Sequence, residues 1–190
     1  KLLVEDGLLK GEELRSIEDD SDVVDYDKAA GLKGPLLKKA CQRFRGDHSF
    51  ENFCQAESQW LDDYALFVVL KGKFDNKSWV EWPDTFKYRN ERVLEDFFER
   101  EAEAIRQVKV TQYLFDRQWQ ALHKWCQDHD ITVIGDMPIY VSHDSADVWS
   151  HQELFDLDDR GYPRSVPAYR RITSARRASG GGIPSINGIL

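Results

Sequence analysis

A carboxylate placed at the end of a buried strand is the first candidate for chemistry in this sequence. Asp136 follows Gly135, which ends the β-branched apolar run 131–134. Such a run is typical of a strand buried on both faces, and in folds made of β/α units the loops at the carboxyl ends of the strands carry the chemistry. The alternative is a turn or helix-capping aspartate, because Asp is common just after strands. Position alone leaves both interpretations open.

Two other groups of polar residues could suggest a metal site, and we interpret both differently. His143 and Asp144 are neighbours in the sequence with no third ligand in view, so we reject a metal site there. Three aspartates precede Gly161, but the spacing and the closing glutamate of an EF-hand are missing, and an acidic turn is the better interpretation. The run 144–147 is typical of a helix start with capping acids.

The composition indicates a globular protein suited to a neutral ligand. The 190 residues are 41% apolar and 12% aromatic, with a formal net charge of −8, which argues against general binding to nucleic acid or to an anionic membrane. No apolar stretch has the length of a membrane span, and no secretory signal opens the chain. The three cysteines are odd in number and lack metal-type spacing, so we expect reduced, buried thiols. These features predict a cytoplasmic protein, with a plastid stroma as the alternative.

Helices must position the predicted strand. Apolar patterns predict helices near 11–17, from Pro35 to 44, over 50–70, over 91–108 and over about 110–127. The last of these would bury one face, made of Val110, Tyr113, Leu114, Ala121, Leu122, Trp125 and Cys126. The polar connection 71–90 holds Trp79 and Trp82, which could stack on sugar rings, although we favour their docking onto the helices.

Several stretches, in sequential order, closely resemble one enzyme family. They are GDMPIYV (135–141) followed by DSADVW (144–149), YLFDRQWQALHKW (113–125), ELFDLDDRGYP (153–163), LLVEDGLL (2–9) and WVEWPDTFKYRN (79–90). The family is that of the amylomaltases, the 4-α-glucanotransferases that disproportionate maltooligosaccharides. The resemblance covers most of residues 1–166, and several long matches in order are more specific than any isolated motif.

The resemblance implies an α/β fold, an incomplete (β/α)8 TIM barrel fragment. Residues 1–130 would form a helix-rich insertion between early barrel strands. Residues 131–166 would contain a barrel strand and the active-site loop that follows it. An incomplete barrel leaves strand edges unpaired, so we expect marginal stability.

The resemblance also implies the reaction. The family moves α-1,4-glucan segments between maltooligosaccharides by a retaining mechanism in which one carboxylate is the nucleophile and another the acid/base, without cofactor or metal. In the family both acids lie on later barrel strands, so we expect this chain alone to be inactive. Asp136 matches the acid at the end of the third barrel strand, near the donor-sugar subsite, while Pro138 and Asp144 carry over as shaping residues of the substrate site. The expected partner is an α-glucan, with no nucleic acid or membrane partner and no assigned oligomeric state.

Two other functions remain open from the residues themselves. One is hydrolysis of an α-glucan by the same barrel, because these residues do not reveal the acceptor. The other is a small binding protein whose basic tail recognises RNA or an acidic partner. Residues 167–190 hold four arginines and no acid, whereas all 34 acids precede them. Back-translation of this tail in a shifted frame can spell a family-like continuation, so we interpret 167–190 as the product of a one-nucleotide deletion near Val166.

Overall fold

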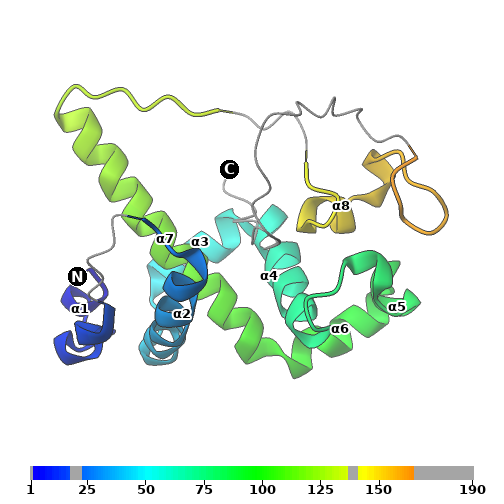
Figure 1. Ribbon diagram of the computed structural model, residues 1–190, viewed down its shortest axis with the longest axis horizontal. Helices are drawn as coiled ribbons and strands as arrows, with labels where there is room; N and C mark the ends of the chain where they lie inside the picture. The colour runs from blue at the N-terminus through cyan, green and yellow to red at the C-terminus, as the bar shows by residue number, and fades with distance from the viewer. Residues whose placement is uncertain (1, 18–22, 137–140, 165–190) are drawn as a thin grey trace.

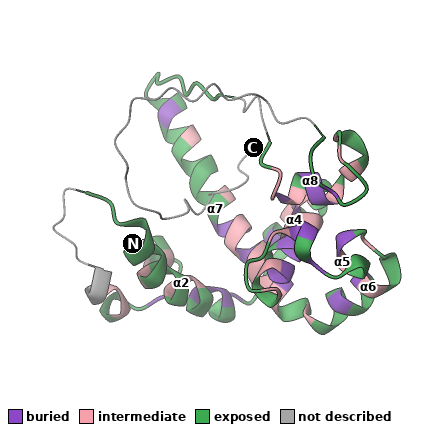
Figure 2. Ribbon diagram, turned by 45° about the vertical axis from the view of Figure 1, so that its right-hand side comes forward, coloured by how far each residue is buried: buried purple, intermediate pink, exposed green. Residues whose placement is uncertain are grey.

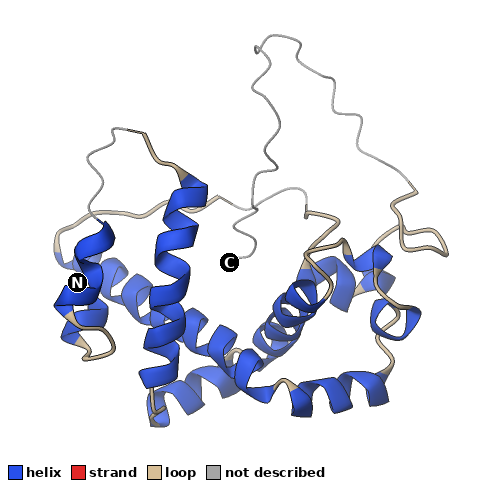
Figure 3. Ribbon diagram, turned by 60° about the horizontal axis from the view of Figure 1, so that its bottom comes forward, coloured by secondary structure: helices blue, strands red, loops and turns tan. Residues whose placement is uncertain are grey.

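The structure is a computed structural model that describes residues 2–17, 23–136 and 141–164 (Figure 1). Over these ranges its regular elements are helical (Figure 3). In chain order they are α1 (Leu2–Glu5), the 3-10 helix η1 (Gly11–Ile17), α2 (Tyr26–Arg43), α3 (His48–Ala56), α4 (Ser58–Lys73), η2 (Trp79–Glu81), α5 (Asp84–Lys87), α6 (Glu91–Arg100), α7 (Ala102–Asp128), α8 (Ala146–Ser150) and η3 (Gln152–Leu154). No helix in the described ranges is long and apolar enough to cross a membrane.

The long helix α7 is the element against which α2, α3 and α4 pack. Its first half buries Ile105, Val110 and Leu114. Packing of such apolar stripes supplies most of the stability of a helix in a protein. The C-terminal part of α7 projects beyond the other helices (Figure 1).

Two apolar clusters form the core. The first joins α4, the Trp79–Trp82 region, α6, the start of α7 and α8, and contains Ala65, Leu66, Phe67, Val69, Leu70, Trp79, Val80, Trp82, Leu94, Phe97, Ile105, Val148 and Trp149. The second joins the N-terminal segment, α2, α3 and the middle of α7, and contains Leu8, Leu9, Ala40, Cys41, Phe44, Phe50, Val110, Tyr113 and Leu114. Val148 and Trp149, which follow the predicted site loop, therefore pack in the first cluster against residues 65–105, more than 40 positions earlier in the sequence.

The predicted helices exist, but some of their limits are wrong. The helix predicted over 50–70 is divided into α3 and α4, which meet at Glu57. The helix predicted to begin at Pro35 begins nine residues earlier, so that Pro35 lies inside α2. Proline has no backbone N–H, so the carbonyl four residues earlier in the helix has no helical hydrogen bond. Because Pro35 is exposed, water can bind that carbonyl instead.

The boundary between the last two long helices also differs from the prediction. The helix predicted over 91–108 ends at Arg100, and α7 begins at Ala102. An ion pair of 2.9 Å joins Lys73 Nζ to Glu101 Oε1 at the break. The contact comes from another helix, so local periodicity could not reveal it.

The predicted strand over 131–134 is wrong for the described residues. The run is an extended loop, in which the side chains of Ile131, Val133 and Ile134 are 47%, 43% and 90% exposed. A strand buried on both faces needs neighbouring strands for its N–H and C=O groups. The described ranges offer one isolated β-bridge, between Leu157 and Pro163, and no strand beside 131–134. The barrel part of the predicted fold is accordingly not formed within these residues.

Candidate functional site

The first predicted site residue lies at the end of an exposed loop. Asp136 is exposed and is the last described residue before the gap at 137–140. Pro138 lies outside the described residues. The Asp136 carboxylate is thus open to a ligand, and it is separated from Asp144 by the gap.

Asp144, the third predicted site residue, is held by the helical part of the chain. Its Oδ2 accepts a hydrogen bond from Lys71 Nζ at 2.5 Å, and its Oδ1 accepts one from the backbone N–H of Trp79 at 3.3 Å. The ammonium of Lys71 also donates to the carbonyls of Asn76 and Lys77, at 3.2 Å each. These contacts fix the start of the 141–164 segment to the end of α4.

A second set of contacts fixes the same segment from its other side. Trp79 Nε1 donates to the carbonyl of His143 at 2.7 Å, and the two rings lie 5.3 Å apart. Nε2 of His143 is 2.7 Å from the carbonyl oxygen of Gly161. Trp79 and Trp82 are 0% and 3% exposed, which confirms that they dock onto the helices. They have no free face for a sugar ring.

The helix that follows Asp144 is capped by a hydroxyl. Ser145 Oγ accepts from the backbone N–H of Val148 at 3.3 Å, so the predicted helix start is confirmed, but its cap is the serine and not a carboxylate. The helix buries Trp149 completely, and its Nε1 donates to the carbonyl of Phe86 at 3.0 Å. The guanidinium of Arg89 stacks on this indole, 4.3 Å from the ring centroid.

The acidic stretch before Gly161 forms a turn. Asp158 Oδ1 accepts from the backbone N–H groups of Arg160 and Tyr162, at 2.9 Å each. The bond from Tyr162 is the main cause that lowers the pKa of the Asp158 carboxyl. The prediction of an acidic turn is confirmed. Across the described part of the chain, no three His, Cys, Asp or Glu side chains are grouped to hold a metal ion.

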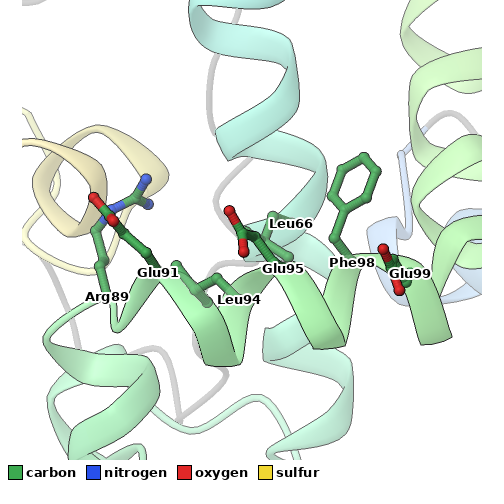
Figure 4. Close-up of a pocket in the computed structure, with 7 residues that line it drawn as sticks. All are labelled: Leu66, Arg89, Glu91, Leu94, Glu95, Phe98 and Glu99. Carbon is green, nitrogen blue, oxygen red and sulfur yellow. The ribbon is translucent and has the colours of Figure 1, made fainter.

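A groove that sequence reasoning missed lies along α6. Its volume is ≈ 360 Å³, and the residues that line it are Leu66, Arg89, Glu91, Leu94, Glu95, Phe98 and Glu99 (Figure 4). Three glutamates recur every four residues along its edge, and this spacing could have predicted an acidic border on one helix face. The groove lies on the helical body, away from the predicted site loop in the sequence.

The described site residues do not form a complete catalytic centre. What the geometry provides is a rigid support: Lys71, Trp79 and Trp149 hold the segment after the loop, while the Asp136 carboxylate at the loop's start is exposed. The partners of Asp144 lie 65 and 73 residues away, so no local pattern could have found them. Such an arrangement can orient a loop that binds polar ligands.

Comparison with known proteins gives a consistent result over most of the chain. The model of a family described as 4-alpha-glucanotransferase matches residues 1–184. The chain is 40% identical over 171 residues to the chloroplastic/amyloplastic 4-alpha-glucanotransferase DPE1 of Oryza sativa subsp. japonica, a match that covers 86% of this chain and 29% of the relative. It is 41% identical over 166 residues to the 4-alpha-glucanotransferase of Streptococcus pneumoniae, covering 84% and 33%.

A solved structure agrees with these relatives. The fold is similar to that of the amylomaltase from Streptococcus agalactiae in complex with acarbose, with a TM-score of 0.78 and 36% identity over 84% of this chain and 34% of that chain. The chain therefore spans about a third of the length of the proteins it matches.

Proposed function

Because this chain belongs to the 4-alpha-glucanotransferase family, we propose that it forms part of an enzyme that transfers α-1,4-glucan segments between maltooligosaccharides. The observation that carries the proposal is the similarity to an amylomaltase that was solved with acarbose. Asp136 has an exposed carboxylate after the extended run 131–134, and it is the group in this chain that we propose to bind the sugar.

The proposed reaction is a double displacement. A carboxylate attacks the anomeric carbon of the donor and the bond to the leaving sugar breaks, while an acid gives its proton to the departing oxygen. The same group then takes a proton from an acceptor hydroxyl, which attacks the glycosyl-enzyme and restores the original anomeric configuration. We place both of these carboxylates outside this chain. The chain alone is therefore expected not to transfer glucan.

In this scheme Asp136 is a supporting residue at the donor subsite. A carboxylate offers about four acceptor sites and can bind two sugar hydroxyls at once. Hydrogen bonds to charged groups contribute about 1.5–3 kcal/mol, enough to orient the sugar without entering the covalent chemistry. Pro138 and Asp144 would shape the loop, and Asp144 has a means to do so through Lys71.

The finer points of fold and location are also proposals. We infer that 131–134 becomes a barrel strand when neighbouring strands are supplied, and that 1–130 forms a helix-rich insertion. We also propose an α-glucan as the ligand, and the cytoplasm or a plastid stroma as the location. Relatives named for both a Streptococcus and a chloroplast support the location.

A chimaera tests the proposed function. Residues 1–164 of this chain replace the matched region of the Streptococcus pneumoniae relative, and the product is assayed for disproportionation of maltotriose into glucose and longer oligosaccharides. We expect transfer, and we expect Asp136→Asn to lower kcat/KM by roughly tenfold or more, as one lost charged hydrogen bond predicts. A folded chimaera without transfer would refute the proposal, and glucose formation without longer products would indicate a hydrolase.

Asp130→Asn is the matched control for this experiment. Asp130 lies six residues before Asp136 and has a φ of 57°, a left-handed conformation that Asn tolerates as well as Asp. The Asp130→Asn substitution removes one negative charge from the same loop, as Asp136→Asn does. Equal losses in the two variants would mean that charge near the loop, and not a contact of Asp136, is responsible.

A further inference from the structure

The groove along α6 has an apolar floor. Leu66 of α4 and Leu94 of α6 line it and are buried, and Phe98, which is 37% exposed, forms part of its wall. Buried and exposed residues alternate along α6, as Figure 2 shows, so the helix buries one side in the first core cluster and leaves another side open. The volume of ≈ 360 Å³ lies within the range of pockets that bind small molecules. The floor therefore suits the apolar part of a ligand.

Three carboxylates border this floor. Glu91, Glu95 and Glu99, which we call the groove glutamates, are exposed and extend from α6 to the same side as Phe98 (Figure 4). None of them forms an ion pair within the described ranges, including with Arg92 of the same helix. Positions four apart in an α-helix are about 6 Å apart along its axis, and like charges at this spacing destabilise the helix. The groove glutamates therefore form a row of uncompensated negative charge.

The cations that flank the groove already have partners. Arg89 Nη2 donates to Asp63 Oδ1 at 2.6 Å. Lys109 Nζ lies 2.5 Å from Asp62 Oδ1 and 5.4 Å from the centroid of the Phe98 ring. Each of these two cations is thus balanced by an aspartate of α4, and the three negative charges of the groove glutamates remain. The complementary ligand is a cation.

The spacing of the carboxylates decides which kind of cation fits. A magnesium or calcium ion needs several oxygen ligands at about 2.0–2.6 Å from one point. The described part of the chain has no group of three acidic, histidine or cysteine side chains that could hold a metal ion. A linear polyamine meets the spacing instead, because a chain of four methylenes with bonds of about 1.5 Å sets two nitrogen atoms about 6 Å apart.

We propose that the α6 groove binds a linear polyamine of the spermidine class. One ammonium group lies on each of the groove glutamates, and the methylene chain lies on Leu66, Leu94 and Phe98. An ammonium carries three N–H donors and a carboxylate only acceptors, so each contact is a charge-assisted hydrogen bond. Binding also removes the repulsion between carboxylates on successive turns. The site belongs to the helical body, and the inference does not depend on the proposed function.

Isothermal titration calorimetry of the full chain with spermidine tests the proposal. We expect saturable 1:1 binding at low ionic strength, and weaker binding as salt is added, because salt screens exposed charges. Glu95→Gln should lower the affinity about two- to fivefold, as the loss of one exposed ion pair predicts. Asp96→Asn is the matched control, because it removes one charge from an exposed position about 100° round the helix and should leave the affinity unchanged.

Two further titrations separate the groove from a general attraction between charges. Magnesium chloride should displace spermidine no better than sodium chloride at the same ionic strength, because a compact ion cannot span the groove glutamates. Phe98→Ala should weaken spermidine binding, because the methylenes lose apolar contact area. Far-UV circular dichroism verifies that each variant keeps its helices.

Four results would overturn the proposal. They are the absence of saturable binding, equal losses of affinity in Glu95→Gln and Asp96→Asn, displacement by magnesium beyond the effect of ionic strength, and an unchanged affinity in Phe98→Ala. Equal losses in the two charge variants would mean that binding follows the net charge of −8 and not the groove.

Carbodiimide coupling locates the bound polyamine by a separate measurement. The reagent forms an amide between a ligand amine and a nearby carboxylate, and mass spectrometry of the tryptic peptide 93–100 compares Glu95, Glu99 and Asp96 within one fragment. We expect spermidine on either glutamate about two- to fivefold more often than on the aspartate, in line with the affinity lost per ion pair. Equal coupling to all three carboxylates would place the polyamine outside the groove and overturn the proposal.

Discussion

Substitution of Gly161 by alanine should destabilise the protein in two ways, through an unfavourable backbone conformation and through a steric clash with Trp79. Gly161 has a φ of +84°, a backbone conformation that glycine adopts readily and residues with a Cβ atom disfavour. A Cβ atom added there would lie 2.8 Å from Trp79 Cη2 and 3.0 Å from Trp79 Cζ3. The indole cannot move aside freely, because it is fully buried and its Nε1 donates to the carbonyl of His143. The turn would have to shift away from the first core cluster.

The magnitude follows from the two terms. The left-handed conformation costs an alanine about 1–2 kcal/mol. Forcing a methyl group into packed surroundings costs about 1–3 kcal/mol more. We therefore expect the free energy of unfolding to fall by about 2–5 kcal/mol, a large part of the roughly 5–15 kcal/mol that stabilises a typical protein.

Two other glycines provide the controls for a urea titration followed by circular dichroism. Gly7 has a φ of +70° and open space around its Cβ position, so Gly7→Ala should show the conformational cost alone. Gly72 lies in α4 with open space as well, and Gly72→Ala should stabilise the protein by about 0.4–1 kcal/mol. If Gly161→Ala costs no more than Gly7→Ala, Trp79 yields to the methyl group and the reasoning about a rigid indole is wrong.

Three further predictions concern the ends of the chain and the support of the loop. Asp144→Asn removes the partially exposed ion pair with Lys71 and should lower the free energy of unfolding by about 1 kcal/mol, as measured by urea titration. An unchanged free energy of unfolding would show that the pair does not stabilise the fold. The pKa of Glu13 is lowered to about 2, chiefly by its hydrogen bonds with Arg43, so its stabilising contribution is complete above pH 4.5 and is lost as the pH falls toward 2. Thermal melts between pH 5 and pH 2 should thus lose stability less steeply in Glu13→Gln, and identical slopes would contradict this. Sequencing of the source DNA should reveal a one-nucleotide deletion near the codon of Val166, whereas an intact frame would leave the basic tail as a genuine part of the protein, within a family match that extends to residue 184.

Much of the helical part was readable from the sequence because the signals are local. Apolar spacing over 110–127 reflects the period of the helix itself, and the buried Val110 and Leu114 follow from it. The same spacing also predicted that Ala121, Leu122 and Trp125 are buried, which is wrong: all three are exposed in the described structure. The docking of Trp79 and Trp82 also follows from residue type, since large aromatic side chains contribute most when buried. The stretches shared with 4-alpha-glucanotransferases identify the family without any coordinates.

Tertiary structure decided what depends on distant partners. The role of Asp144, which Lys71 holds, depends on a residue far away in the sequence. A strand is the extreme case, because its ladder hydrogen bonds all join it to neighbouring strands. The composition of 131–134 indicates a strand, but the described residues provide no neighbour, so the run stays extended and exposed. Local periodicity therefore predicted that the helices exist, because their backbone bonds are internal, although it misplaced several of their ends. It could not suffice for a strand or a site built by separate segments.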